Sequence, residues 1–336
     1  MTRLERWHAG HARLALALTL PAAALGASLP APGAGLQAGL LAGLVAVLGL
    51  PHGAVDHLSG KILLRPRFGW GWPLVFGGLY SLAALAVIGL WWLWPPGVLV
   101  GFLILAIVHF GAEDVASAPV LPPGRAGHAA RVGRAGEALV RGAVPVSLPV
   151  LFHPDATAAL FAALLPEAPA EAVRPVLAAL APMAGGHLAM LAALALAGLA
   201  RGAAGRGRIL IAVEIAALVA AFASLPVLLA FAVYFCLWHA PRHTLATVAA
   251  LDDADLRAGL WRFVRAAVPL TVATIALGGA VWALRPAGLA PDAAALRVVF
   301  IGLAALTVPH VALGAVLAAW REGDGATEGV ARSRDI

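Results

Sequence analysis

The chain has 336 residues with a formal net charge of +6; 62% of them are hydrophobic, 12% are charged and one is a cysteine. A soluble domain carries about twice that share of charged residues, so the composition excludes an ordinary soluble fold and indicates a polytopic membrane protein. The basic excess comes without a basic face interleaved with aromatic side chains, which argues against a nucleic-acid partner, and the lone Cys236 excludes a disulfide and a cysteine-rich metal cluster.

Hydrophobic segments of membrane length follow one another along most of the chain. We count about ten, most of them roughly 17–25 residues long, and expect an all-α membrane helix bundle. The first segment lacks a small-residue cleavage site, so we expect a span there and no cleaved signal peptide. A short apolar stretch at 156–165 is expected to lie at the membrane interface. The expected spans are 12–30, 34–52, 72–94, 97–113, 137–153, 172–200, 208–225, 226–243, 263–284 and 293–320.

Basic residues fill alternate loops, as the positive-inside rule requires of cytoplasmic loops. The loops between them are mostly neutral or acidic, so the pattern places both termini in the cytoplasm and indicates a multi-pass protein of the inner cell membrane. We expect one integral-membrane domain over 1–336, with its functional core at about 34–320 and a polar tail at 321–336. The basic loop residues are Lys61, Arg65 and Arg67; Arg125, Arg131 and Arg134; Arg201, Arg206 and Arg208; and Arg242, Arg257 and Arg262.

Seven of the 11 histidines lie in or beside the spans that run inward. Counting ~1.5 Å per residue places one histidine of each such span roughly 18–27 Å from the outer end. That depth is the inner half of a ~30 Å hydrocarbon core, where ionisable groups indicate a functional site. A metal held by imidazole and carboxylate there would be iron, zinc, copper or nickel. The seven are His52, His57, His109, His187, His239, His243 and His310, whereas His8, His11, His128 and His153 are expected to be surface residues.

The pair His239 and His243 is four residues apart, so both rings lie on one face of a helix, close enough to share a metal. Pro241 lies between them, removes a backbone donor and is expected to bend the helix. Arg242 is expected to point away from the pair, toward the cytoplasmic headgroups.

Three carboxylates lie near these histidines or inside a span. Asp56 follows His52 by four residues, and Glu113 follows His109 by four. Each is expected either to accept a hydrogen bond from the far ring nitrogen of a metal-binding imidazole or to be solvated at the helix end. Glu214 lies well inside a span, where it is expected to pair with an arginine or histidine or to be a protonated hydrogen-bond donor.

Four sequence blocks resemble those of the Brp/Blh family of membrane β-carotene 15,15′-dioxygenases in order and spacing. They are 51–56, 109–111, 234–243 and 300–310, and the resemblance covers residues from about 45 to 320. It implies an iron-dependent membrane oxygenase that cleaves β-carotene or a related carotenoid at its central double bond with O₂, giving two retinal molecules, often for a microbial rhodopsin. It implies Fe(II) ligands at His52, His109, His239 and His243. His310 and His57 are further candidates, and the pattern leaves open whether they or His187 also bind the metal.

The substrate channel is expected to be apolar and aromatic. Phe110, Tyr234, Phe235 and Trp238 neighbour the expected ligands and are candidates for its lining, with packing and lipid-facing roles as alternatives. β-Carotene is a hydrocarbon about as long as the bilayer core is thick, so an enzyme acting on it is expected within the lipid. No nicotinamide, flavin or phosphate-binding motif is present in the sequence.

Three other classes of membrane protein also use intramembrane histidines. A metal or proton transporter fits a relay of histidines and acids, although transporters often show repeated halves with broken helices, and this sequence shows none. A two-iron desaturase or hydroxylase needs more histidines than these. In a structural protein held together by histidine hydrogen bonds, the histidines need not lie at one depth, so their common depth argues against this class.

Overall fold

The computed structural model describes residues 3–117, 128–165, 170–200, 206–252 and 254–334, and these residues contain helices and no strand. The expectation of an all-α bundle is confirmed. The helices are α1 (Arg3–Ser28), α2 (Ala34–Leu44), α3 (Leu50–Ala54), α4 (Asp56–Phe68), α5 (Trp72–Leu93), α6 (Pro95–Ala116), α7 (His128–Gly142), α8 (Val144–Phe152), α9 (Pro154–Leu164), α10 (Ala170–Ala200), α11 (Arg206–Ser224), α12 (Val227–Val233), α13 (Ala240–Leu251), α14 (Leu256–Ala283) and α15 (Pro291–Arg334), with π-helical turns η1 (Val45–Gly49) and η4 (Tyr234–His239) and a 3₁₀ turn η2 (Gly69–Gly71).

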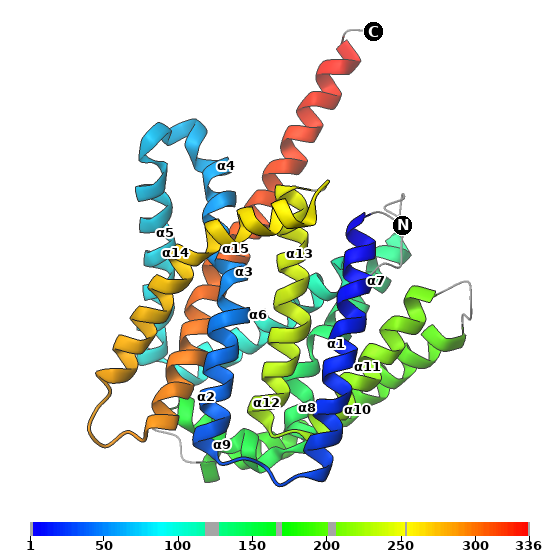
Figure 1. Ribbon diagram of the computed structural model, residues 1–336, viewed down its shortest axis with the longest axis vertical. Helices are drawn as coiled ribbons and strands as arrows, with labels where there is room; N and C mark the ends of the chain where they lie inside the picture. The colour runs from blue at the N-terminus through cyan, green and yellow to red at the C-terminus, as the bar shows by residue number, and fades with distance from the viewer. Residues whose placement is uncertain (1–2, 118–127, 166–169, 201–205, 253, 335–336) are drawn as a thin grey trace.

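Six helical runs among the described residues are long and apolar enough to cross a bilayer, or seven if α7 and α8, bent by 46°, form one span. One of the six, Ala34–Leu93, is 60 residues long and reverses direction at Gly69, so that α4 and α5 lie side by side (Figure 1). Gly69 has a φ of 51°, a conformation that glycine adopts without a Cβ clash. The count of ten spans stays a prediction.

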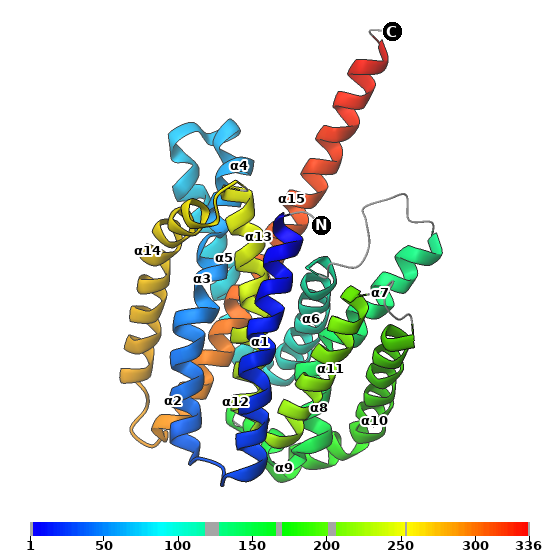
Figure 2. The ribbon, with the colours of Figure 1, turned by 45° about the vertical axis from the view of Figure 1, so that its right-hand side comes forward.

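α15 lies at the centre of the site-bearing half of the bundle, where it packs against α2, α4, α5, α6, α9 and α14. Its C-terminal part continues as a helix to Arg334 and projects beyond the other helices (Figures 1 and 2). α1 begins and α15 ends at the same end of the bundle. This agrees with termini on one side of the membrane, and their placement in the cytoplasm stays a prediction. The short helix α9 forms where the interfacial stretch was expected.

Two helical segments contain a π-helical turn shortly before a proline. Proline lacks an N–H and its ring clashes with the carbonyl four residues earlier, so a regular α-helical ladder cannot pass it. In the π turns the backbone hydrogen bond joins residues five apart: Leu50 N–H donates to the carbonyl of Val45, and Ala240 N–H donates to the carbonyl of Phe235. Such turns are frequent at functional sites, and here one shortly precedes His52 and the other includes His239.

The two π turns pack against each other. A Cβ atom on Gly49 would lie 2.6 Å from the ring of Phe235, so only glycine permits this approach without a shift. The contact brings the ring of His52, three residues after Gly49, to 5.6 Å from the ring of His239, measured between centroids. Backbone geometry and the absence of one side chain thus position two of the expected ligands.

Candidate metal centre

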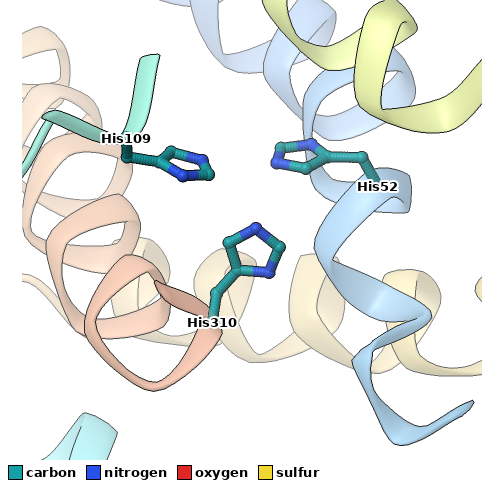
Figure 3. A group of neighbouring side chains, drawn as sticks. All are labelled: His52, His109 and His310. Atoms are coloured by element: carbon teal, nitrogen blue, oxygen red, sulfur yellow. The ribbon is translucent and has the colours of Figure 1, made fainter. Parts of the chain in front are cut away.

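Five imidazole rings gather at one place inside the bundle, from α3, α6, η4, α13 and α15. Their centroids lie 4.9–5.6 Å apart in six pairs, with His109 to His239 the closest. Ring nitrogens of His52, His109 and His310 lie within 4.8 Å of one another, and the three rings converge on one point (Figure 3). The histidine cluster is His52, His109, His239, His243 and His310.

Two deep histidines lie outside this cluster. His187 on α10 uses both ring nitrogens, one with Ser147 and the other with the carbonyl of Val140 at 2.7 Å, so it ties α10 to α7 and α8. His57 has its Nδ1 3.0 Å from the carbonyl of Ala54. In the part of the chain that the structure describes, neither ring contacts the cluster, which leaves them without support as ligands.

Hydrogen bonds orient two rings of the cluster. Nδ1 of His52 bonds the carbonyl of Gly49, and Nδ1 of His310 lies 2.9 Å from the carboxylate of Asp56. Tyr80 donates to the same carboxylate at 2.9 Å. With Nδ1 protonated and occupied, Nε2 of each ring is left as an acceptor, which is how metal-binding imidazoles are held in proteins.

Asp56 therefore supports a different histidine from the one that the spacing indicated. A helix continuing from His52 would have carried Asp56 onto the same face, but Val55 breaks the helix, with φ −92° and ψ 2°. The break turns Asp56 toward α15 and His310, 254 residues later in the chain. Glu113 is half-buried one turn after His109, and its role beside a metal stays a prediction.

Two of the remaining rings, His239 and His243, have buried ring nitrogens without a protein partner in the described structure. Among the described residues, both ring nitrogens of His239 and Nδ1 of His243 are buried and accept or donate no hydrogen bond. Each such group costs about 1–3 kcal/mol when left unsatisfied. His239 is fully buried, with its ring 4.5 Å from that of Phe110 and 5.7 Å from that of Phe235. Clustered imidazole nitrogens in such surroundings are a donor set for a transition-metal ion.

A cavity of about 630 Å³ borders the histidine cluster, and its lining is mainly apolar. Phe110 and Phe235 line it, as expected. Tyr234 and Trp238 do not: they are fully buried behind the wall, where Tyr234 donates to Asp114 at 3.2 Å and Trp238 to Thr19 at 3.0 Å. The expectation that these two line the channel is wrong, because their polar atoms are taken by buried partners. Aromatic residues not anticipated from the sequence complete the lining: Trp72, Phe76, Tyr80, Phe102 and Phe231.

Arg242 does not reach the headgroups, contrary to the sequence-based expectation. It is only 5% exposed and bridges two acids, with its guanidinium nitrogens 2.6 Å from Asp114 and 2.7 Å from Glu214. Glu214 also binds Arg141 at 3.0 Å, which confirms the arginine alternative for this acid. The alternation of basic and neutral loops led us to expect Arg242 in a loop. Its acidic partners lie on α6 and α11, far from it in the sequence, so the local charge pattern could not show that it is buried. The buried ion pairs of Arg242 with Asp114 and Glu214 join α6, which carries His109, to α13, which carries His243.

The N-terminal histidines are not surface residues either. His8 is buried, and Nε2 of His11 lies 2.8 Å from the carbonyl of Leu237, because α1 packs along α11 and α13. His153 similarly bonds the carbonyl of Phe222 at 2.8 Å, a packing role. The side chain of His128 lies outside the described part of the structure.

Sequence reasoning also missed Tyr80 as an orienting residue. The chain has only two tyrosines, and each donates its hydroxyl to a buried aspartate, Tyr80 to Asp56 and Tyr234 to Asp114. A buried tyrosine hydroxyl needs a partner. The presence of only two tyrosines and a few acids inside apolar segments could therefore have predicted these tyrosine–aspartate hydrogen bonds.

The chain is similar to proteins of one known family. The family model described as Beta-carotene 15,15'-dioxygenase matches residues 43–318. The probable beta-carotene 15,15'-dioxygenase Blh of Halobacterium salinarum is 32% identical, over 90% of this chain and 93% of its own. The beta-carotene 15,15'-dioxygenase of the uncultured marine bacterium 66A03 is 28% identical over 80% and 90%, and the probable enzyme Brp of Halobacterium salinarum is 30% identical over 83% of both. No solved structure matches the chain. With the matched segment spanning all five rings of the histidine cluster, the chain belongs to the beta-carotene 15,15'-dioxygenase family.

Proposed function

We propose that this protein cleaves β-carotene at its central 15,15′ double bond with O₂ and forms two retinal molecules. The observation that carries the proposal is the position of the histidine cluster on the wall of a cavity of about 630 Å³ with a mainly apolar lining. The relatives named for this reaction match along most of their length. A hydrocarbon substrate fits such a lining because burying apolar surface is favourable by roughly 25 cal/mol per Å².

The histidine cluster would hold one Fe(II) ion. The unsatisfied nitrogens of His239 and His243 support a cation at this place, and a set of neutral imidazoles without thiolate suits Fe(II). The ring distances favour His310 as a fifth ligand beside the four that the resemblance implies, since its centroid lies 5.2 Å from those of His109 and His243. Fe(II) bound there would supply the activation of O₂.

The protein's own residues hold the ligands and keep water away. The carbonyl of Gly49 and the carboxylate of Asp56 fix the rings of His52 and His310 with Nε2 toward the cluster. Phe110 and Phe235 pack against His239, line the cavity beside it and offer flat apolar surfaces to a polyene. The roles of these residues are to orient imidazoles and to bind and position the substrate.

We further place the protein in the inner cell membrane with about ten spans and both ends in the cytoplasm, as the alternation of arginine-rich and neutral loops supports. Its carotenoid substrate is then dissolved in the same bilayer. Its product retinal is expected to pass to a retinal-binding rhodopsin in that membrane.

Removing the carboxylate that orients His310 is expected to weaken metal binding. We expect Asp56→Asn to lower Fe(II) affinity by about 10–100-fold, the usual effect of losing a partner of a ligating imidazole. Tyr80→Phe, which leaves the carboxylate in place but removes one of its donors, is expected to have a smaller effect. Equilibrium dialysis against Fe(II), with metal content measured by mass spectrometry, gives the affinities. Asp155→Asn, at an exposed ion pair, serves as the control, and equal affinities in all variants would refute this role for Asp56.

The proposed function is tested in a bacterium that accumulates β-carotene. Expression of the chain is expected to bleach the cells and to produce retinal, which chromatography identifies. Unchanged carotene together with stoichiometric iron in the purified protein would refute cleavage and leave the metal site standing. Protein that purifies without metal and keeps its activity in chelator would refute the metal site.

A further inference from the structure

The cavity beside the histidine cluster reaches the outside of the bundle between α5 and α14. Several residues on these two helices both line the cavity and are exposed, and such residues mark its mouth. They are Gly77 and Ser81 on α5 and Arg265, Pro269 and Leu270 on α14. Both helices pack against α15 and lie on the same side of the molecule (Figure 1).

Apart from Arg265 and Ser81, the surface around this mouth is apolar. Leu74 and Leu82 on α5 and Val272 and Leu277 on α14 are large, exposed and hydrophobic. Exposed apolar side chains on such helices in a polytopic membrane protein face acyl chains, because water would be an unfavourable neighbour. The mouth therefore opens into the bilayer.

Gly77 leaves this mouth wide. A Cβ atom built there meets no atom within 4 Å, and Gly77 lines the cavity, so a side chain at this position would extend into open space beside the mouth. The next residue, Gly78, is also exposed and equally free of neighbours, but it does not line the cavity. The two glycines are thus matched in backbone and surroundings and differ in the direction that they face.

We propose that a long apolar polyene with a cyclic end enters the cavity from the lipid between α5 and α14, and that Gly77 determines the width of end group that passes. This proposal rests on the function proposed above, because the carotenoid substrate is the one named there. It makes Gly77 a determinant of which substrates enter the cavity, although Gly77 lies on α5, a helix that carries none of the five imidazoles.

Gly77→Leu and Gly78→Leu test this mouth. In protein reconstituted into lipid, we expect Gly77→Leu to lower kcat/KM for β-carotene by about 10-fold or more through KM, with iron content unchanged. A carotenoid with acyclic ends is expected to lose less, and Gly78→Leu to behave as the wild type. Wild-type activity in Gly77→Leu, or equal losses in both variants, would overturn the proposal.

A binding measurement separates this proposal from the proposed function. Transfer of β-carotene from vesicles to the protein is followed by the shift of its absorption band. Binding that Gly77→Leu slows and Gly78→Leu does not would support the mouth even if no carotenoid were cleaved. Unimpaired transfer in Gly77→Leu would overturn the mouth and leave the cleavage reaction standing.

A separate observation concerns α1, which precedes the segment 43–318 matched by the family. α1 packs against α11, α13 and η4 through small residues such as Ala12 and Ala15. Two of its polar side chains reach the turn that carries His239: Nε2 of His11 bonds the carbonyl of Leu237 at 2.8 Å, and Oγ1 of Thr19 accepts from Trp238 at 3.0 Å.

The bond from His11 compensates for a proline. In a regular helix the carbonyl of Leu237 would accept from residue 241, but Pro241 has no N–H to donate. His11 supplies a donor from another helix, and its ring also packs edge-on against Trp238, with centroids 6.3 Å apart. Leu237 and Trp238, the two residues before His239, are therefore both held by α1. We infer that α1 positions His239, and that His11 is the residue through which it acts.

Two replacements of His11 separate its donor from its ring. His11→Gln keeps an N–H donor at similar reach, and His11→Phe keeps a ring without a donor. We expect His11→Phe to bind Fe(II) or the spectroscopic probe Co(II) about 10-fold more weakly and to alter the visible bands of Co(II), while His11→Gln stays within about 3-fold of the wild type. If His11→Phe does not fold, Thr19→Val tests the same turn through Trp238.

His153→Phe is the matched control, because His153 also bonds a backbone carbonyl, that of Phe222, at 2.8 Å. It is expected to lose thermal stability and to keep its metal affinity. Metal affinity unchanged in His11→Phe, with a stability loss like that of His153→Phe, would reduce His11 to a packing role and overturn the inference.

Discussion

We expect His239→Ala to lose its bound iron and all measurable retinal formation while the bundle stays folded. His239 is fully buried at the centre of the histidine cluster, with its ring 4.9 Å from that of His109 and 5.6 Å from that of His52. Both of its ring nitrogens lack a protein partner in the described structure, and a bound metal ion would give one of them a partner. The loss of iron affinity is expected to exceed the roughly 100-fold effect of losing an orienting partner. Iron per protein by mass spectrometry and retinal by chromatography measure both effects.

His187→Ala is the control for this variant. His187 was also expected from the sequence to lie deep in the membrane, but both of its ring nitrogens bond protein groups. We expect reduced thermal stability and unchanged iron content. The assignment of the cluster would be contradicted if His239→Ala kept its iron, or if His187→Ala lost as much.

Arg242→Met is expected to destabilise the protein by about 3–5 kcal/mol, the usual effect of removing one partner from a buried ion pair. Asp114 and Glu214 are 1% and 3% exposed, and Arg242 is bonded to both. Glu214 keeps Arg141 in the variant, whereas Asp114 loses its bonded arginine. Unfolding in mixed micelles of increasing denaturing-detergent content measures the free energy.

Three further variants complete this test. Arg174→Met removes an arginine from an exposed pair, with side chains 54% and 81% exposed, and is expected to change the free energy of unfolding by less than about 1 kcal/mol. Arg242→Lys is expected to be intermediate, because an ammonium lacks the planar fork that bridges two carboxylates. Adding Asp114→Asn to Arg242→Met is expected to recover part of the loss. Equal effects for Arg242→Met and Arg174→Met would contradict the buried network.

Counting residues from the ends of apolar segments predicts depth in the membrane but not the direction in which a side chain points. His52, His109, His239 and His310 were expected at one depth, and their rings do converge. His187 was expected at the same depth, but its ring faces α7 and α8. Direction depends on where π turns and breaks reset the helical phase, and Val45–Gly49 and Val55 could not be recognised from spacing alone.

Pairs between distant helices are the other part that the sequence could not supply. His310 and Asp56 are 254 residues apart, and Trp238 and Thr19 are 219 apart. Arg242 was expected among the headgroups because its local sequence is that of a loop end; its burial depends on Asp114 and Glu214 arriving from two other helices. Local periodicity contains no information on such contacts.

The ratio of product to substrate tests central cleavage at the histidine cluster most directly. Purified, iron-loaded protein in lipid is given β-carotene and O₂, and carotene consumed and all carbonyl products formed are counted. Central cleavage at the histidine cluster predicts two retinal molecules for each β-carotene, with none formed by His239→Ala. Carbonyl products of unequal length, or retinal formed equally by His239→Ala, would contradict it.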